Sequence, residues 1–181
     1  MGESDHKKRI STAKIVAFIG VMAATLECAK LALSFLPNIE VVTLLTALYS
    51  YVFGIYGLIA SVVFVSIEPL IYGFGTWVVS YYIYWPTVAL VFMLFARIKV
   101  KNRFILATGA VMLTVWFGIL STLIDIGLLS GFFDNFLYRF SVYYLRGIPF
   151  YIAQILSNAV LFPLLFKFLE RKLLLVKHSL L

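Results

Sequence analysis

Long apolar stretches separated by short polar segments run along almost the whole chain. They cover residues 13–36, 41–71, 78–96, 104–127 and 143–170. An α-helix needs about 20 apolar residues to cross the hydrocarbon core of a bilayer, and each stretch is about that long or longer. The pattern therefore predicts at least one membrane-spanning helix in each stretch, and Pro37 is expected to end the first one.

The stretch at 41–71 admits two interpretations, one long helix or two shorter helices broken between Gly54 and Gly57. One helix would give five crossings and would place two of the chain's three basic clusters outside the cell. Two helices give six crossings and keep all three clusters in the cytoplasm, as the positive-inside rule requires. We therefore predict helices at 41–54 and 57–71, with both termini cytoplasmic. The first of these is short for a bilayer of about 30 Å and needs support from its neighbours or local thinning.

The basic residues define these clusters. Most of the 15 precede the first apolar stretch, lie between the fourth and fifth predicted helices, or follow the last one: Lys7, Lys8, Arg9 and Lys14; Arg97, Lys99, Lys101 and Arg103; Lys167, Arg171, Lys172 and Lys177. Their placement explains the net charge of +7 as a topology signal rather than a binding patch. We therefore expect no nucleic-acid partner.

The composition agrees with an integral membrane protein. The chain is 63% hydrophobic and 13% charged, with a mean hydropathy of +1.03. We expect one all-α transmembrane domain over 1–181, which leaves no room for a soluble domain, so that any catalytic or ATP-driven unit would be another chain. The lone Cys28 excludes a disulfide within the chain, and its simplest role is that of a small packing residue.

Nothing in the chain resembles a catalytic centre. Both histidines, His6 and His178, lie in the terminal segments, and no Ser/His/Asp arrangement, metal-ligand spacing or glycine-rich phosphate loop is present. We therefore expect no enzymatic activity, no metal and no cofactor.

The charged residues outside the N-terminal tail, the basic loop and the C-terminal tail fall in the predicted outer half of the membrane: Glu27, Lys30, Glu40, Glu68, Asp125, Asp134, Arg139 and Arg146. A charge in a bilayer costs roughly 2.5 to 3.5 kcal/mol, so such residues usually face a protein interior or a wet cavity. A polar cavity open to the outside is therefore one interpretation. In the other, Glu40, Asp134 and Arg139 are solvated loop residues in outer connections, the longer of which covers 128–142, and Glu27 and Lys30 form an i, i+3 pair.

Aromatic residues gather in the same outer half: Tyr72, Trp77, Tyr81, Tyr84 and Trp85. Together with a few polar groups they suit a small ring compound, because stacking supplies affinity and polar contacts fix orientation. The outer ionisable set contains more acids than bases, which favours a neutral or cationic ligand. The alternative for each aromatic residue is an interfacial belt that faces lipid headgroups.

Small residues recur along the first predicted helix at spacings of three and four: Ala13, Ala17, Gly20, Ala24 and Cys28. They share one helix face, and such a face lets another helix approach closely in a membrane. The alternative is ordinary tight packing within the bundle.

The chain resembles the substrate-binding S component of energy-coupling factor (ECF) vitamin transporters over nearly its whole length. The resemblance rests on the size, the six crossings, the motifs Ala13-x-x-x-Ala17 and Gly20-x-x-x-Ala24, and three further segments: LPNIEVVTLLTALYSYVFG, IYGFGTW and RGIPFYIAQILSNAV. It implies a multi-pass protein of a prokaryotic plasma membrane that captures a vitamin or related micronutrient outside. A transmembrane T component and two cytoplasmic ATPase subunits would be its partners.

The resemblance also implies residue roles. The small-residue face, Ala13, Ala17, Gly20 and Ala24, would dock onto the T component. The substrate would contact Asn38, Glu40, Trp77, Tyr81, Trp85, Asp125, Arg146, Gln154 and Asn158. Many relatives have an acidic residue or a histidine where this chain has Gln154 and Asn158, so the identity of the substrate does not transfer. A six-span scaffold or morphogenetic protein of cell-wall synthesis, without a small-molecule ligand, is the alternative function.

Overall fold

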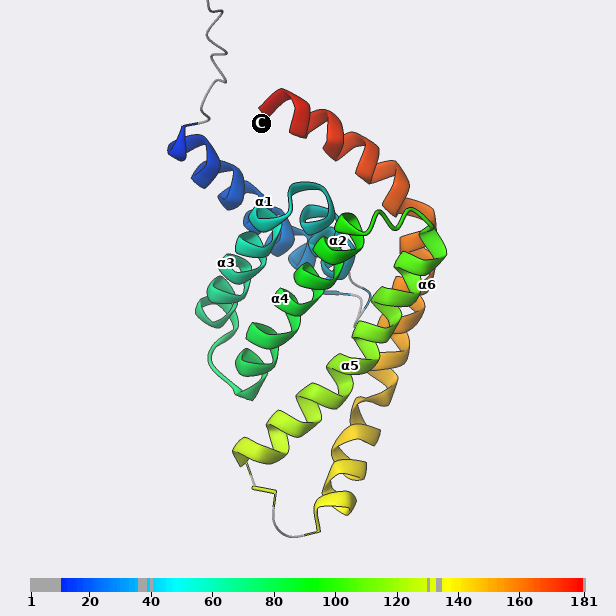
Figure 1. Ribbon diagram of the computed structural model, residues 1–181. Coiled ribbons are helices and arrows are strands. Elements are labelled where there is room, and N and C mark those ends of the chain that lie inside the picture. The colour runs from blue at the N-terminus through cyan, green and yellow to red at the C-terminus, as the bar shows by residue number, and fades with distance from the viewer. Residues whose placement is uncertain (1–10, 36–38, 40, 130, 133–134, 181) are drawn as a thin grey trace, which may run out of the picture.

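The computed structural model describes residues 11–35, 39, 41–129, 131–132 and 135–180, and this part of the chain forms six helices and no strand (Figure 1). They are α1 (Thr12–Ala32), α2 (Val42–Phe53), α3 (Ile55–Tyr72), α4 (Thr76–Arg97), α5 (Arg103–Leu129) and α6 (Phe136–Leu180). All except α2 are long and apolar enough to cross a membrane. The predicted all-α class is therefore confirmed.

The break between α2 and α3 confirms that the stretch at 41–71 forms two helices. Only Gly54 separates them, and its φ of +60° lies in the left-handed region that glycine adopts without strain. The helices then approach so closely at Gly57 that a Cβ there would lie 2.4 Å from the backbone nitrogen of Ser50. Glycine at both positions thus permits an abrupt helical hairpin.

Three predicted boundaries were wrong, in the first and last helices. Helix α1 ends at Ala32 rather than near residue 36, and residues 33–35 form turns, with the Leu33 N–H donating to the Lys30 carbonyl at 3.3 Å. Helix α6 covers 136–180 instead of 143–170, so the long outer connection predicted at 128–142 is mostly helical.

Aromatic spacing explains the early start of α6. Phe136, Phe140 and Tyr144 are four residues apart, and successive ring centroids lie 5.9 and 5.7 Å apart. These i, i+4 contacts stabilise the first turns of the helix although Arg139 interrupts the apolar pattern. At the other end, Leu169 and Leu173 pack against the hydrophobic core, which extends the helix through its basic residues.

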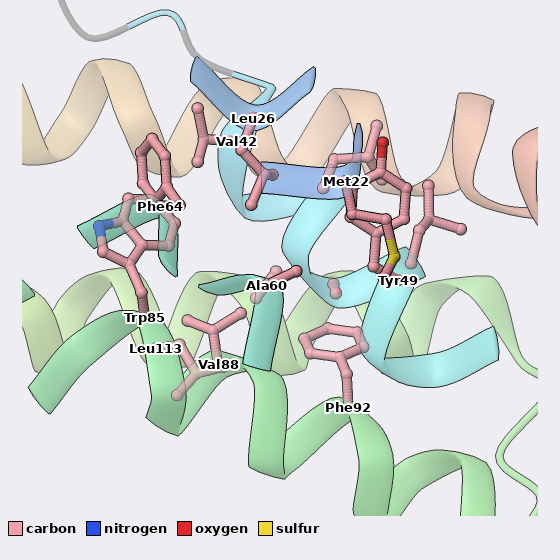
Figure 2. Packing of buried hydrophobic residues seen from close by; sticks show 14 of the residues in the cluster. Met22, Leu26, Val42, Tyr49, Ala60, Phe64, Trp85, Val88, Phe92 and Leu113 are labelled. Carbon is pink, nitrogen blue, oxygen red and sulfur yellow. The ribbon is translucent and has the colours of Figure 1, made fainter. Parts of the chain in front are cut away.

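The buried core surrounds α2, which lies inside the bundle (Figures 1 and 2). Ten of its 12 residues are buried, and it packs against α1, α3, α4 and α6. Phe64 of α3 and Val88 and Phe92 of α4 are fully buried in the same cluster. Helix α2 would span only about 18 Å at 1.5 Å per residue. Its neighbours shield it from lipid, which agrees with the expected need for their support.

The basic segments meet at one end of the bundle, here called the basic end. Figure 1 places the start of α1, the α4–α5 connection and the end of α6 toward the top, and the α3–α4 connection, the end of α5 and the start of α6 toward the bottom. Contacts agree: the Tyr51 hydroxyl donates to the Val100 carbonyl at 2.8 Å, and Lys177 Nζ donates to the Val52 carbonyl at 2.6 Å. The opposite end is called the far end.

Candidate functional site

A charged cluster lies between α1, α3 and α4, toward the far end. Lys30 of α1 forms an ion pair with Oε2 of Glu68, which is fully buried on α3. The Lys30 ammonium also lies over two aromatic rings, 4.3 Å from the centroid of Tyr72 and 5.3 Å from that of Tyr81. Two ring faces and one carboxylate thus hold a single ammonium group, an arrangement in which both the ion pair and the cation–π contacts stabilise the charge.

Glu27 adds a second carboxylate to this cluster. Glu27 is only 7% exposed, and its carboxyl group interacts electrostatically with Lys30, Glu68 and Tyr72. Neither of its carboxylate oxygens meets hydrogen-bond geometry with a described residue, and Oε1 of Glu68 also has no such partner. Two carboxyl groups and one ammonium group thus lie together in this cluster, so its chemistry suits a positively charged or N–H-donating group.

The i, i+3 pair between Glu27 and Lys30 is not what the structure forms. Among the described residues, Lys30 makes its ion pair with Glu68, 38 positions along the chain. The signal for this site was present in the sequence, since three charges occur in apolar helices, but the pairing depends on how α1 and α3 are rotated against each other.

Next to the cluster, an aromatic row runs along one face of α4. Trp77, Tyr81 and Trp85 are four residues apart, and their successive ring centroids are 5.2 and 5.8 Å apart in edge-to-face contacts. Trp85 is 3% exposed and also packs edge-to-face against Phe64, as Figure 2 shows. Its indole nitrogen has no hydrogen-bond partner among the described residues. At least the inner part of the row is therefore a packed wall rather than a belt that faces lipid headgroups.

Phe117 connects this aromatic row to α5. Its ring centroid lies 6.1 Å from that of Tyr81 and 4.7 Å from that of the buried Tyr84. One turn earlier on α5, Thr114 accepts a hydrogen bond of 3.0 Å from Nδ2 of Asn158 on α6. Asn158 is fully buried, and its Oδ1 atom has no partner among the described residues. An amide oxygen without a described partner thus lies beside the turn of α5 that precedes Phe117.

The remaining predicted substrate residues are distributed around this centre. Oδ1 of Asp125 accepts a 2.5 Å hydrogen bond from Thr76, next to Trp77, at the far end. Gln154 is buried one turn before Asn158, whereas Arg146 is exposed. Asn38 and Glu40 lie outside the described residues. The structure thus brings together the α4 row and its neighbours on α5 and α6, and it leaves Arg146 outside this centre.

An apolar cavity of about 430 Å³ lies beside α6. Its lining includes Ile39, from the connection after α1, and Ala153 and Ser157 of α6. Substrate contacts are predicted from the sequence in both segments, the connection after α1 and the middle of α6. The cavity shows that these two segments adjoin.

The small-residue face of α1 is exposed along its whole length. Ala13, Ala17, Gly20 and Ala24 all face outward, and a Cβ added at Gly20 would meet nothing within 4 Å. The buried side of α1 is formed by other residues, among them Met22 and Leu26. The alternative of tight packing within the bundle is therefore wrong. The same exposure contradicts the packing role expected for Cys28.

These features define a multi-pass helical membrane protein. The bundle surface carries many exposed large apolar side chains, among them Leu164 and Phe168 of α6, which suit contact with lipid. Within the described residues, no group of three or more potential metal ligands occurs. Comparisons with protein-family models, with curated proteins and with solved structures found no match.

Proposed function

We propose that this protein is the substrate-binding subunit of an ECF-type importer. Helix α1 is the observation that carries the proposal. Its exposed small-residue face begins at the basic end, while Glu27 and Lys30 on the same helix line the charged cluster toward the far end. One helix thus combines a surface for a membrane partner with part of a polar site.

The ligand site of this proposal lies between the charged cluster and the aromatic row of α4. Buried polar side chains from four helices would border it: Glu27 of α1, Glu68 of α3, Trp85 of α4 and Asn158 of α6. Of these, Nε1 of Trp85 and Oδ1 of Asn158 have no hydrogen-bond partner among the described residues. Buried polar atoms without partners are costly, so a ligand that supplies hydrogen bonds to them gains affinity. The rings of Tyr81 and Trp85 supply flat apolar contact for a ring compound.

The charge balance favours a neutral or cationic ligand, as the sequence predicts. Glu27 and Glu68 provide two carboxylates, and Lys30 neutralises one of them. An anionic ligand would add a third acidic group to a cluster with one ammonium group, whereas an amine or a protonated ring nitrogen would pair with a carboxylate at low dielectric. The proposed cargo is thus a small vitamin or related micronutrient with N–H donors.

The proposed partners follow from the exposed face of α1. Helices associate in lipid through close van der Waals packing, which small residues permit. A transmembrane T component would pack on this face, and two ATPase subunits bound to it would hydrolyse ATP. The protein itself would bind and deliver the ligand without catalysing a reaction.

The direct test is mass spectrometry of a small molecule released by denaturing the purified protein. We expect one small molecule per protein after growth in rich medium, and loss of that molecule in the Trp85→Ala variant. Met112→Ala, at a lipid-exposed position of α5, is the matched control and should retain it. No retained molecule in repeated preparations, together with no vitamin that raises the melting temperature, would rule out the transporter and favour the scaffold.

Docking is tested in cells that supply the T component and the ATPases. Ala17→Trp should abolish uptake while the affinity for the retained compound stays within about twofold, because position 17 faces away from the bundle. Met112→Trp introduces the same side chain on another exposed surface and should leave uptake intact. Equal loss of binding and uptake in Ala17→Trp would contradict a docking role.

A further inference from the structure

A second cavity, of about 600 Å³, opens at the basic end. It is formed where the hairpin between α2 and α3 meets the last turns of α4 and the end of α6. Its lining includes Tyr51, Phe53, Ile55, Met93, Arg97 and Lys177. The cavity is separate from the charged cluster, and the proposed transport function does not use it.

Two cations line this cavity. Arg97 is exposed and forms no ion pair with a described acidic residue. Lys177 uses one N–H to reach the Val52 carbonyl, which leaves its other N–H groups for a further acceptor. Glu170, the acidic residue of this part of α6, is paired with Lys167 at 2.6 Å. The lining therefore has an uncompensated positive charge that suits an anion.

An exposed apolar stripe leads from the cavity along α3. Ile55 lines the cavity and is 52% exposed, and Ile59 and Val62 follow on the same helix face at 41% and 38% exposed. In a membrane this stripe contacts hydrocarbon, whereas Arg97 and Lys177 lie at the level of the polar end. Cationic and apolar surfaces thus adjoin in the order in which a phospholipid presents its phosphate and its acyl chain.

We propose that this cavity binds the headgroup phosphate of an anionic membrane phospholipid, with an acyl chain along Ile55, Ile59 and Val62. The Arg97 guanidinium offers paired N–H donors to phosphate oxygens, and Lys177 adds a second charge. By the positive-inside rule the lipid belongs to the cytoplasmic leaflet. A cation near a membrane surface contributes about a fivefold factor to the affinity for anionic lipid. The site would fix the hairpin between α2 and α3 to α4 and α6.

Native mass spectrometry of the detergent-solubilised protein tests this proposal by titration with phosphatidylglycerol, phosphatidylcholine or sodium phosphate. We expect one phosphatidylglycerol to bind in preference to phosphatidylcholine. Arg97→Gln should weaken its binding about fivefold, and Arg97→Gln with Lys177→Gln roughly thirtyfold. The matched control is Lys101→Gln with Lys172→Gln, which removes the same charge from exposed positions outside the cavity and should change affinity by less than about twofold.

Three outcomes would overturn the proposal. Equal loss of binding in the control double variant would show diffuse attraction to the basic end. Competition by inorganic phosphate at the concentration of the lipid would show a free-anion site. Equal retention of both lipids would show that charge does not select the occupant. The single Arg97→Gln variant keeps the test valid if loss of the Lys177 contact with Val52 prevents folding.

Discussion

At the residue scale, Lys30 is the group on which the charged cluster depends. It neutralises one of two buried carboxylates and lies over the rings of Tyr72 and Tyr81. Removing one member of a buried ion pair leaves the other charge uncompensated, which costs more than the pair itself contributes. The cluster therefore ties the packing of α1 against α3 to one ammonium group.

Lys30→Met is expected to lower the free energy of unfolding by roughly 3 to 5 kcal/mol, because Glu68 and Glu27 would remain buried without a cation. Lys30→Met combined with Glu68→Met should recover most of this loss, since the remaining cluster would hold one carboxylate instead of two. Thermal unfolding in detergent measures both effects. Lys101→Met, at an exposed position, is the control, and an equal loss there would contradict the assignment.

The sequence located these charges but not their partners. The sequence placed Glu27, Lys30 and Glu68 in the outer half of the membrane, where charges are rare and costly, but the predicted substrate residues included none of them. Their pairing across two helices could not be predicted, because an i, i+3 contact within one helix fits the same sequence. The candidate residues Trp77, Tyr81 and Trp85 were easier to group, since a spacing of four places them on one helix face.

At the scale of the element, two glycines show how differently one residue type acts. Gly57 lies at the closest approach of α3 to α2, where a Cβ would collide with the backbone of Ser50. Gly20 lies on the outer face of α1, where an added Cβ would have no atom of the rest of the chain within 4 Å. Gly57 is thus required by the hairpin, whereas no contact within the described chain requires Gly20.

Gly57→Ala should destabilise the protein by about 1 to 3 kcal/mol or more, because the clash involves backbone atoms that cannot rotate away. Gly20→Ala should be neutral or stabilising by up to roughly 1 kcal/mol, since alanine has the higher helix propensity. Thermal unfolding of the two purified variants compares them directly. Equal stability of both variants would mean that α2 and α3 are not packed as described.

The sequence predicted helix boundaries correctly where the residues that end a helix act within that part of the chain. Gly54 divides α2 from α3, and the fourth and fifth helices were predicted to within two residues at either end. Helix α6 was not predicted at full length, because aromatic contacts stabilise its first turns despite Arg139 and packing on the core stabilises its basic last turns. A prediction from hydropathy alone places the end of a helix at the first charged residues, even where the helix continues.

At the scale of the whole molecule, the basic segments gather at one end of the bundle and the α3–α4 connection lies at the other (Figure 1). This arrangement agrees with six alternating crossings, with α2 as the short buried one. By the positive-inside rule we expect the basic end to lie in the cytoplasm.

Labelling with a membrane-impermeant thiol reagent tests this orientation in a Cys28→Ala background, because Cys28 is exposed. Phe74→Cys, between α3 and α4, should react in intact cells, whereas Lys101→Cys and His178→Cys should react only after the membrane is opened. Both positions chosen at the basic end are exposed, so access to the reagent depends on the side of the membrane. Reaction of Lys101→Cys in intact cells would reverse the topology.

The sequence by itself determined the class of protein, the number of helices and the grouping of positive charge. Hydropathy and charge can be added up over a short segment of sequence without knowing which residues that segment contacts. Only the tertiary structure decided which face of each helix points inward. In a chain this apolar, lipid-facing and protein-facing surfaces have the same composition, so periodicity does not separate them. The outward small-residue face of α1, the ion pair of Lys30 with Glu68, the burial of α2 and the cavity beside Arg97 all depend on that rotation.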